Sequence, residues 1–180
     1  MVQMVSARKS GASDLVHMFS IVMDMSTNPT APALTWAQFA TASPGLAAEV
    51  QSLFEQYGQA FGYLATVRLD GGPRVHPVSP VIADGGLFCF VTASPKRRDL
   101  ERDGRYALHA YPAESSDDEA YLAGRVRPVT DEVQQARLAK LHRASADVSW
   151  RLFELDIEIA MVTHRDRPEE PAEHRIWRAC

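Results

Sequence analysis

The residues best suited to chemistry form a cationic cluster at the start of a predicted short helix. Ser94 has the residue type of a helix N-cap, Pro95 suits the first helical position, and Gly104 suits the position after the end. The first turn then contains three cations: Lys96, Arg97 and Arg98. Because a helix dipole favours negative charge at this end, the pattern predicts a phosphate bound by free N–H groups and basic side chains. The local pattern leaves open a solvated basic turn, paired with the acidic residues that follow: Asp99, Glu101 and Asp103.

A second group of candidate residues lies in the predicted strand 73–82, which includes Arg74, His76 and Ser79. Pro77 and Pro80 each remove a donor from the strand ladder, which predicts a bulged strand or an edge strand. Bulges often redirect side chains at functional sites. An ordinary edge strand with a solvated Arg74 and a satisfied His76 is the open alternative.

The elements that must position these residues are mostly strands. Apolar runs at 61–69, 73–82 and 87–92, separated by turn residues at 70–72 and 83–86, predict a three-stranded antiparallel meander. Further strands are predicted at 105–111, 120–129 (with Gly124 as a bulge), 150–162 and 174–178. Helices are predicted at 36–42, from 44 to a stop at Gly58, at 95–103 and at 131–144. In the last helix the apolar residues expected to face inward are Val133, Ala136, Leu138 and Leu141. The fold class expected is mainly β (α+β), a barrel of six or seven antiparallel strands with a few short helices.

The bulk properties exclude several classes of function. The 180 residues suit one domain at 35–180 preceded by a flexible extension at 1–34. A net charge of −4 argues against nucleic-acid binding. No apolar run approaches the roughly 20 residues that span a membrane. Only two cysteines are present, Cys89 in an apolar run and Cys180 at the end, which suits the reducing cytoplasm.

Common catalytic motifs are absent from the sequence. There is no Gly-x-Ser-x-Gly elbow, no Walker loop and no Gly-x-Gly-x-x-Gly. The six histidines are scattered singly and no Cys-x-x-Cys occurs, so no metal site is expected.

The order of these features resembles a known family. A hairpin, the segment 74–80 and the Ser-x-Lys helix start within 92–100 are similar to the pyridoxamine 5′-phosphate oxidase-like flavin-binding split barrels, a superfamily that includes enzymes using the deazaflavin coenzyme F-420. The resemblance runs from about Phe61 to Arg178.

The resemblance implies a split β-barrel, a homodimer, and FMN or, as the alternative, deazaflavin as the cofactor. It implies that Arg74 faces the phosphate and that the residues beside the ring are Val75, His76, Pro77 and Val78, with Ser79 next to them. It places Val91 and Thr92 at the end of the following strand. The phosphate residues that it implies are Ser94, Lys96, Arg97 and Arg98. It further implies that a terminal Trp177-Arg178 pair reaches the cofactor of the partner subunit.

The expected function is that of an oxidoreductase that transfers hydride to or from a small conjugated substrate. Pro95 replaces an arginine of the true oxidases and their C-terminal extension is missing, so pyridoxamine phosphate oxidation is not expected. The deazaflavin has a longer acidic tail, for which Arg97, Arg98, Arg102, Arg105, Arg125 and Arg127 are candidates. Two other readings stay open: a non-catalytic flavin or haem binding or sensor protein, and a barrel that lost its cofactor and serves as an interaction module.

Overall fold

The computed structural model describes residues 32–112, 114, 116–144, 148–165 and 171–180. The helices in this part of the chain are α2 (Trp36–Ala42), α3 (Pro44–Glu55), α4 (Pro95–Arg102) and α5 (Glu132–Leu141). The strands are β1 (Gly62–Val67), β2 (Pro73–Val78), β3 (Val81–Ala83), β4 (Gly86–Thr92), β5 (Arg105–Ala110), β6 (Glu119–Pro128), β7 (Trp150–His164) and β8 (Glu173–Arg178).

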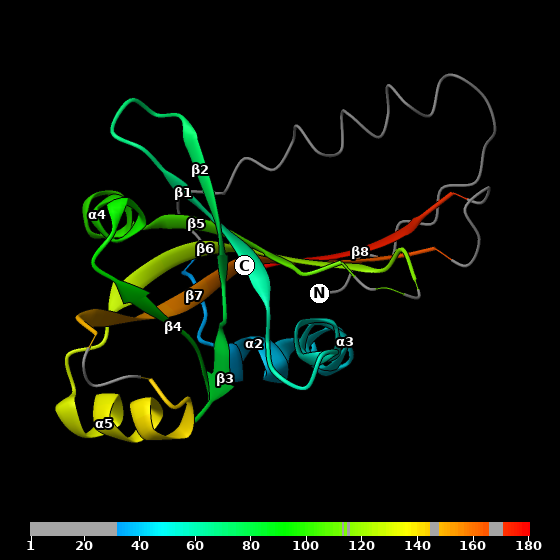
Figure 1. Ribbon diagram of the computed structural model, residues 1–180. Coiled ribbons are helices and arrows are strands. Elements are labelled where there is room, and N and C mark those ends of the chain that lie inside the picture. The colour runs from blue at the N-terminus through cyan, green and yellow to red at the C-terminus, as the bar shows by residue number, and fades with distance from the viewer. Residues whose placement is uncertain (1–31, 113, 115, 145–147, 166–170) are drawn as a thin grey trace.

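The strands form one curled antiparallel sheet in the order β2-β1-β5-β6-β7-β4-β3, and β8 adds to the far half of β7 (Figure 1). The two edge strands of this order, β2 and β3, are consecutive in the chain and are joined only by Ser79-Pro80. The sheet therefore curls into a barrel that is split between these two strands. The expected fold class, a mainly β split barrel, is confirmed.

The predicted meander is wrong. Residues 73–82 form two short strands, because Pro80 interrupts the run and has no N–H to give to a ladder. β2 pairs with β1, whereas β3 pairs with β4, and β4 pairs on its other side with β7. The expectation that the prolines mark an edge strand is confirmed, since β2 lies at one edge of the sheet.

The inner face of the sheet carries the main core. Side chains such as Leu64, Leu108 and Ile157 point inward and pack against Phe39 of α2 and Phe54 of α3. The Thr35 capping box starts α2, and Pro44 occupies the first turn of α3, as their residue types predict. Burial of these aromatic and aliphatic side chains holds α2 and α3 against one end of the barrel (Figure 1).

Helix α5 covers the outer face of β4 and β7 with a face that differs from the predicted one. Of the four residues expected to face inward, only Leu138 is buried, while Val133 is 78% exposed and Leu141 is 65% exposed. The covered face instead runs through Gln134, Leu138 and His142, which are one helical turn apart. A short helix on the outside of a sheet needs only one large apolar side chain to dock, so the apolar residues alone did not identify its face.

Two further expectations concern Gly124 and the chain start. The register of β6 against β7 shifts between Ala123 and Gly124, which confirms the predicted bulge. Residues 1–31 of the expected flexible extension lie outside the described residues, and Leu34 forms a two-hydrogen-bond bridge with Ile157 of β7. The domain boundary stays a prediction. No helix in the described part of the chain is long and apolar enough to cross a membrane.

Candidate functional site

The N-terminus of α4 is open. Ser94 occupies the N-cap position with extended backbone angles, but its hydroxyl donates to the Thr92 carbonyl oxygen at 2.9 Å and makes no cap hydrogen bond. Pro95 has no N–H, and the N–H groups of Lys96 and Arg97 have no partner within a helix at these positions. The first turn contains no acidic residue. This end of α4 therefore presents free donors in a positive field.

The acidic residues around α4 pair with only one of the three cations in its first turn. Asp103 pairs with Arg105, with Nε and Oδ1 2.6 Å apart, and Glu101 pairs with Arg97 at 3.6 Å and with Arg151 at 2.7 Å. Among the described residues, Lys96 and Arg98 form no ion pair. The alternative that the local sequence left open was a solvated basic turn paired with the acidic residues that follow. Of the three cations, only Arg97 fits this alternative.

Strand β2 presents two faces, and only one of them is shared with α4. Arg74 lies opposite Thr66 of β1 and His76 lies opposite Leu64, so both follow the inner face of the sheet, as does Val78. Val75 and Pro77 point to the outer face, where Val75 is 58% exposed. Ser79 follows the strand and is half-buried.

A buried carboxylate that sequence reasoning did not single out connects this strand to the helix. Oδ2 of Asp99 accepts hydrogen bonds from Nε of Arg74 at 2.8 Å and from Oγ1 of Thr66 at 3.1 Å. Its Oδ1 lies 3.4 Å from Nη1 of Arg102. Burial by itself raises the pKa of Asp99, but the hydrogen bonds from these donors outweigh it and hold the pKa below its usual value. The sequence held no local signal for this contact, because Arg74 and Asp99 are 25 residues apart.

The other predicted residues lie in different surroundings. Val91 belongs to the inner core, and Thr92 follows it exposed at the end of β4. Trp177 is 8% exposed and packs on Phe39, with ring centroids 4.9 Å apart. Trp177 and Arg178 lie at the end of β8, where they pair with Ala160 and Ile159 of β7. Trp177 thus packs against α2, and no hydrogen bond or ion pair joins it to the cationic turn among the described residues.

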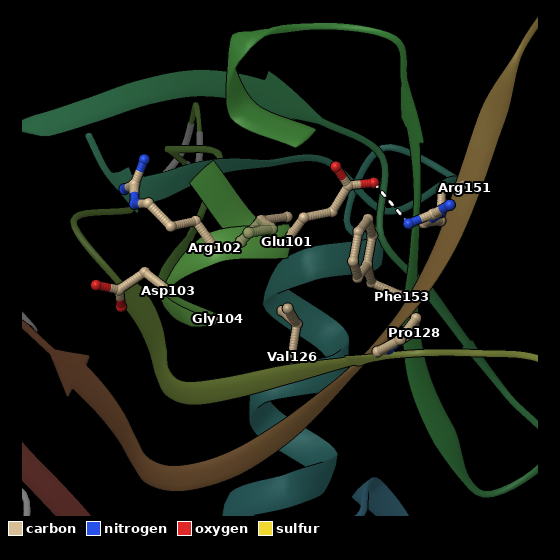
Figure 2. A pocket seen from close by; sticks show the side chains of 9 residues that line it. Glu101, Arg102, Asp103, Gly104, Val126, Pro128, Arg151 and Phe153 are labelled. Atoms are coloured by element: carbon tan, nitrogen blue, oxygen red, sulfur yellow. Dashed lines mark hydrogen bonds and ion pairs between the residues drawn. The ribbon is translucent and has the colours of Figure 1, made fainter. Parts of the chain in front are cut away.

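A pocket of about 310 Å³ lies at the other end of α4, away from its N-terminus. Its wall is partly apolar, with Leu100, Val126 and Phe153, and partly charged. Figure 2 shows the Glu101 carboxylate turned toward Arg151 and away from Arg102 and Asp103. Of the residues predicted to contact a cofactor, only Arg102, a candidate for the deazaflavin tail, lines this pocket.

The buried thiol of Cys89 is not suited to act as a nucleophile. Cys89 is buried on the inner face as expected, and burial raises the pKa of its thiol to about 12, which keeps it protonated. No group of three or more histidine, cysteine, aspartate or glutamate side chains in the described ranges is close enough to hold a metal ion.

The family model described as pyridoxamine 5′-phosphate oxidase matches residues 46–165, and the chain belongs to this family. No curated protein is similar enough in sequence to count as a relative.

Solved structures with low sequence identity share the fold. A protein related to general stress protein 26, from Clostridium acetobutylicum, is 11% identical with a TM-score of 0.54, over 72% of this chain and 95% of its own. A FAD-binding protein from Mesorhizobium loti is 19% identical with a TM-score of 0.51, over 64% of this chain and 90% of its own. A heme binding protein from Mycobacterium smegmatis is 20% identical with a TM-score of 0.51, over 73% of this chain but only 57% of its own.

Proposed function

We propose that the protein binds FMN, with the phosphate at the N-terminus of α4, and acts as an oxidoreductase on a small conjugated substrate. The observation that carries this proposal is the open first turn of α4. The Ser94 hydroxyl is turned to Thr92, and Lys96 and Arg98 have no anionic partner among the described residues. Free N–H groups combined with such side chains suit a phosphate dianion.

The residues present fit the cofactor in two parts. Ser94, Lys96, Arg98 and the terminal nitrogens of Arg74 would hold the phosphate, with Arg97 beside them. The inner face of β2 at His76 and Val78, the backbone of the strand and Ser79 would lie along the ring. When bound, the flavin would supply hydride transfer, while the chain would bind and orient the ring and exclude water from it.

Charge pairing favours FMN over the deazaflavin with its longer acidic tail. Five of the six arginines that could follow such a tail are already paired: Arg97 with Glu101, Arg102 with Asp99, Arg105 with Asp103, Arg125 with Glu158, and Arg127 with Glu154 and Asp156. The sixth, Arg98, lies in the first turn of α4. Binding an acidic tail would require these pairs to break. A single phosphate needs only the cations of the first turn.

The proposed assembly is a homodimer formed through the outer face of β2, β1 and β5. Neighbouring strands present Val75 beside Ala65 and Ala107 there, and Pro77 beside Tyr63. Val75 is 58% exposed, which is unusual for an apolar residue in the middle of a strand. In a dimer of this kind the cofactor residues on the outer face, Val75 and Pro77, would meet the partner subunit. The cytoplasm stays the proposed location, consistent with the free thiols of Cys89 and Cys180.

A non-catalytic haem or flavin protein is the second candidate. It is favoured by His76, whose imidazole follows the inner face next to Arg74, and by the shared fold with a heme binding protein. An imidazole there is suited to act as an axial ligand of haem iron.

Titration of the purified protein with FMN, the deazaflavin coenzyme and haem in parallel tests both candidates. Flavin fluorescence and the haem Soret band report binding. We expect saturable FMN binding at micromolar concentration or below, followed by oxidation of the chemically reduced complex by a quinone. If the protein binds haem and not FMN, and haem binding is lost in His76→Ala, the second candidate would replace the first. Binding of none of the three would overturn both.

A further inference from the structure

We propose that Asp99 is a positioning residue that holds the Arg74 guanidinium in place for the cofactor phosphate. This inference rests on the proposed phosphate site at α4. It assigns a role to a residue that touches neither the phosphate nor the ring.

The first step is the geometry of the Arg74 guanidinium. Asp99 contacts it through Nε alone, at 2.8 Å, and the guanidinium forms no other hydrogen bond or ion pair among the described residues. The two terminal nitrogens therefore keep their N–H donors. The Arg74 side chain is 30% exposed, so these donors are open to a ligand. A guanidinium held along one edge can still give two parallel hydrogen bonds to a phosphate from the other nitrogens.

The second step is the location of Asp99. It lies five residues after Ser94, in the middle of α4, and three and two residues after Lys96 and Arg97, whose N–H groups are open, which is less than one helical turn. The side chain of Asp99 is only 6% exposed and is fixed by Thr66 of β1 as well as by Arg102 of its own helix. Strand β2 and helix α4 are thus joined at one buried point, which holds Arg74 against the turn of α4 that follows the open N–H groups.

The third step separates positioning from charge. A carboxylate near a phosphate repels it, so removal of the Asp99 charge alone would strengthen phosphate binding. Loss of positioning would weaken it. The two roles therefore predict opposite changes in phosphate affinity for Asp99→Asn: an increase if the carboxylate only repels the phosphate, and a decrease if it positions Arg74. The amide would also present an N–H group where the carboxylate accepts hydrogen bonds from Thr66, Arg74 and Arg102, so it cannot replace all three contacts.

The test compares FMN with riboflavin, which lacks the phosphate, on the full-length protein. For Asp99→Asn we expect the Kd for FMN to rise roughly tenfold or more, as for loss of one well-placed charge-assisted hydrogen bond. The Kd for riboflavin should stay unchanged. In an Arg74→Ala background, Asp99→Asn should have no further effect on FMN affinity. Asp103→Asn, on the same helix but paired with Arg105, is the matched control and should leave both affinities unchanged.

Each other outcome overturns the inference. Tighter FMN binding by Asp99→Asn would mean that the carboxylate acts only as a repelling charge. A parallel loss of FMN and riboflavin affinity would mean a purely structural role. If Asp99→Asn does not fold, Thr66→Val gives the same comparison, with an expected rise of about threefold in the Kd for FMN alone; no rise overturns the inference. If the unmodified protein does not bind FMN, the proposed function and this inference are both overturned. If the unmodified protein and Asp99→Asn bind FMN with the same Kd, only this inference is overturned.

Discussion

The Ser94 hydroxyl lies 2.9 Å from the carbonyl oxygen of Thr92 and leaves the N-terminus of α4 without a side-chain cap. An N-cap serine usually accepts a hydrogen bond from the second or third helical residue. Here the hydroxyl donates backward to the end of β4. The helix therefore keeps its N–H groups free at the position where cationic side chains gather.

Ser94→Ala should hardly change stability, because no cap is lost. We expect a decrease in the free energy of unfolding below about 0.5 kcal/mol, compared with about 1 kcal/mol for a typical N-cap. Urea unfolding measures this difference. Asp131→Ala provides the contrast, since Asp131 caps α5 through the N–H groups of Val133 and Gln134 and should cost about 1 kcal/mol. An equal loss in the two variants would contradict the assigned role of the Ser94 hydroxyl.

Lys96→Ala should weaken FMN binding by about 1.5–3 kcal/mol, the range for a lost charge-assisted hydrogen bond. The affinity for riboflavin should not change, because the ring does not contact this side chain in the proposed complex. Isothermal titration with both ligands measures the effect. Lys140→Ala, at an exposed lysine of α5, is the matched control for loss of one positive charge. An unchanged Kd for FMN in Lys96→Ala would count directly against the phosphate site.

Asp99 should make stability depend on pH in the acid range. Its pKa is lowered in the folded protein, so its stabilising contribution is present above the unfolded-state pKa of about 3.9 and is lost as the pH falls through the folded value. We expect Asp99→Asn to lower the free energy of unfolding by about 2–3 kcal/mol at pH 7, less than for a fully buried pair, because Arg74 is partly exposed. The difference from the unmodified protein should shrink below about pH 4.

Urea unfolding at several pH values between 7 and 3 measures that dependence. Asp103→Asn is the comparison: hydrogen bonds from Arg105 lower the pKa of Asp103 to about 2, but the pair lies near the surface, so its effect on stability should be small. A stability difference for Asp99→Asn that stays constant down to pH 3 would show that the carboxylate charge does not stabilise the fold.

Gly124→Ala should destabilise the barrel at the β6 bulge. An added Cβ would meet the carbonyl oxygen of Asp156 at 2.1 Å and the backbone nitrogen of Glu158 at 3.0 Å, and neither belongs to a flexible side chain. We expect a loss of about 2–3 kcal/mol. Gly45→Ala in α3 is the control, because its added Cβ meets no atom within 4 Å, and it should stabilise by up to about 1 kcal/mol. Thermal unfolding of the two variants should thus shift the melting temperature in opposite directions.

The local elements followed from the sequence because their signals lie within a few residues of one another. Thr35 with Gln38 starts α2, Asp131 starts α5, Ser94-Pro95 starts α4, and the glycine at position 124 marks the bulge. Alternation of apolar residues identified most strands for the same reason. Such patterns depend on backbone geometry and on nearest neighbours alone.

The pairing of strands did not follow from the same patterns. The strands on either side of each predicted tight turn are neighbours, as expected, namely β1 with β2 and β3 with β4. The single strand expected at 73–82, however, breaks at Ser79-Pro80 into two strands at opposite edges of the sheet. The partner of β4 is the 15-residue strand β7, more than 50 residues later in the chain. No short-range pattern carries that choice, because it depends on which inner faces fit together around the core.

By itself, the sequence determined most of the helix and strand segments, the cationic turn at Lys96 to Arg98 and the resemblance to the split-barrel flavoproteins. Only the tertiary structure decided that Arg74 reaches Asp99, that Val75 and Pro77 point outward, and that Trp177 packs on Phe39. The first set depends on local conformational preferences, which neighbouring residues express directly. The second depends on sheet register and burial, which arise only when distant segments pack together and the buried polar groups must find partners.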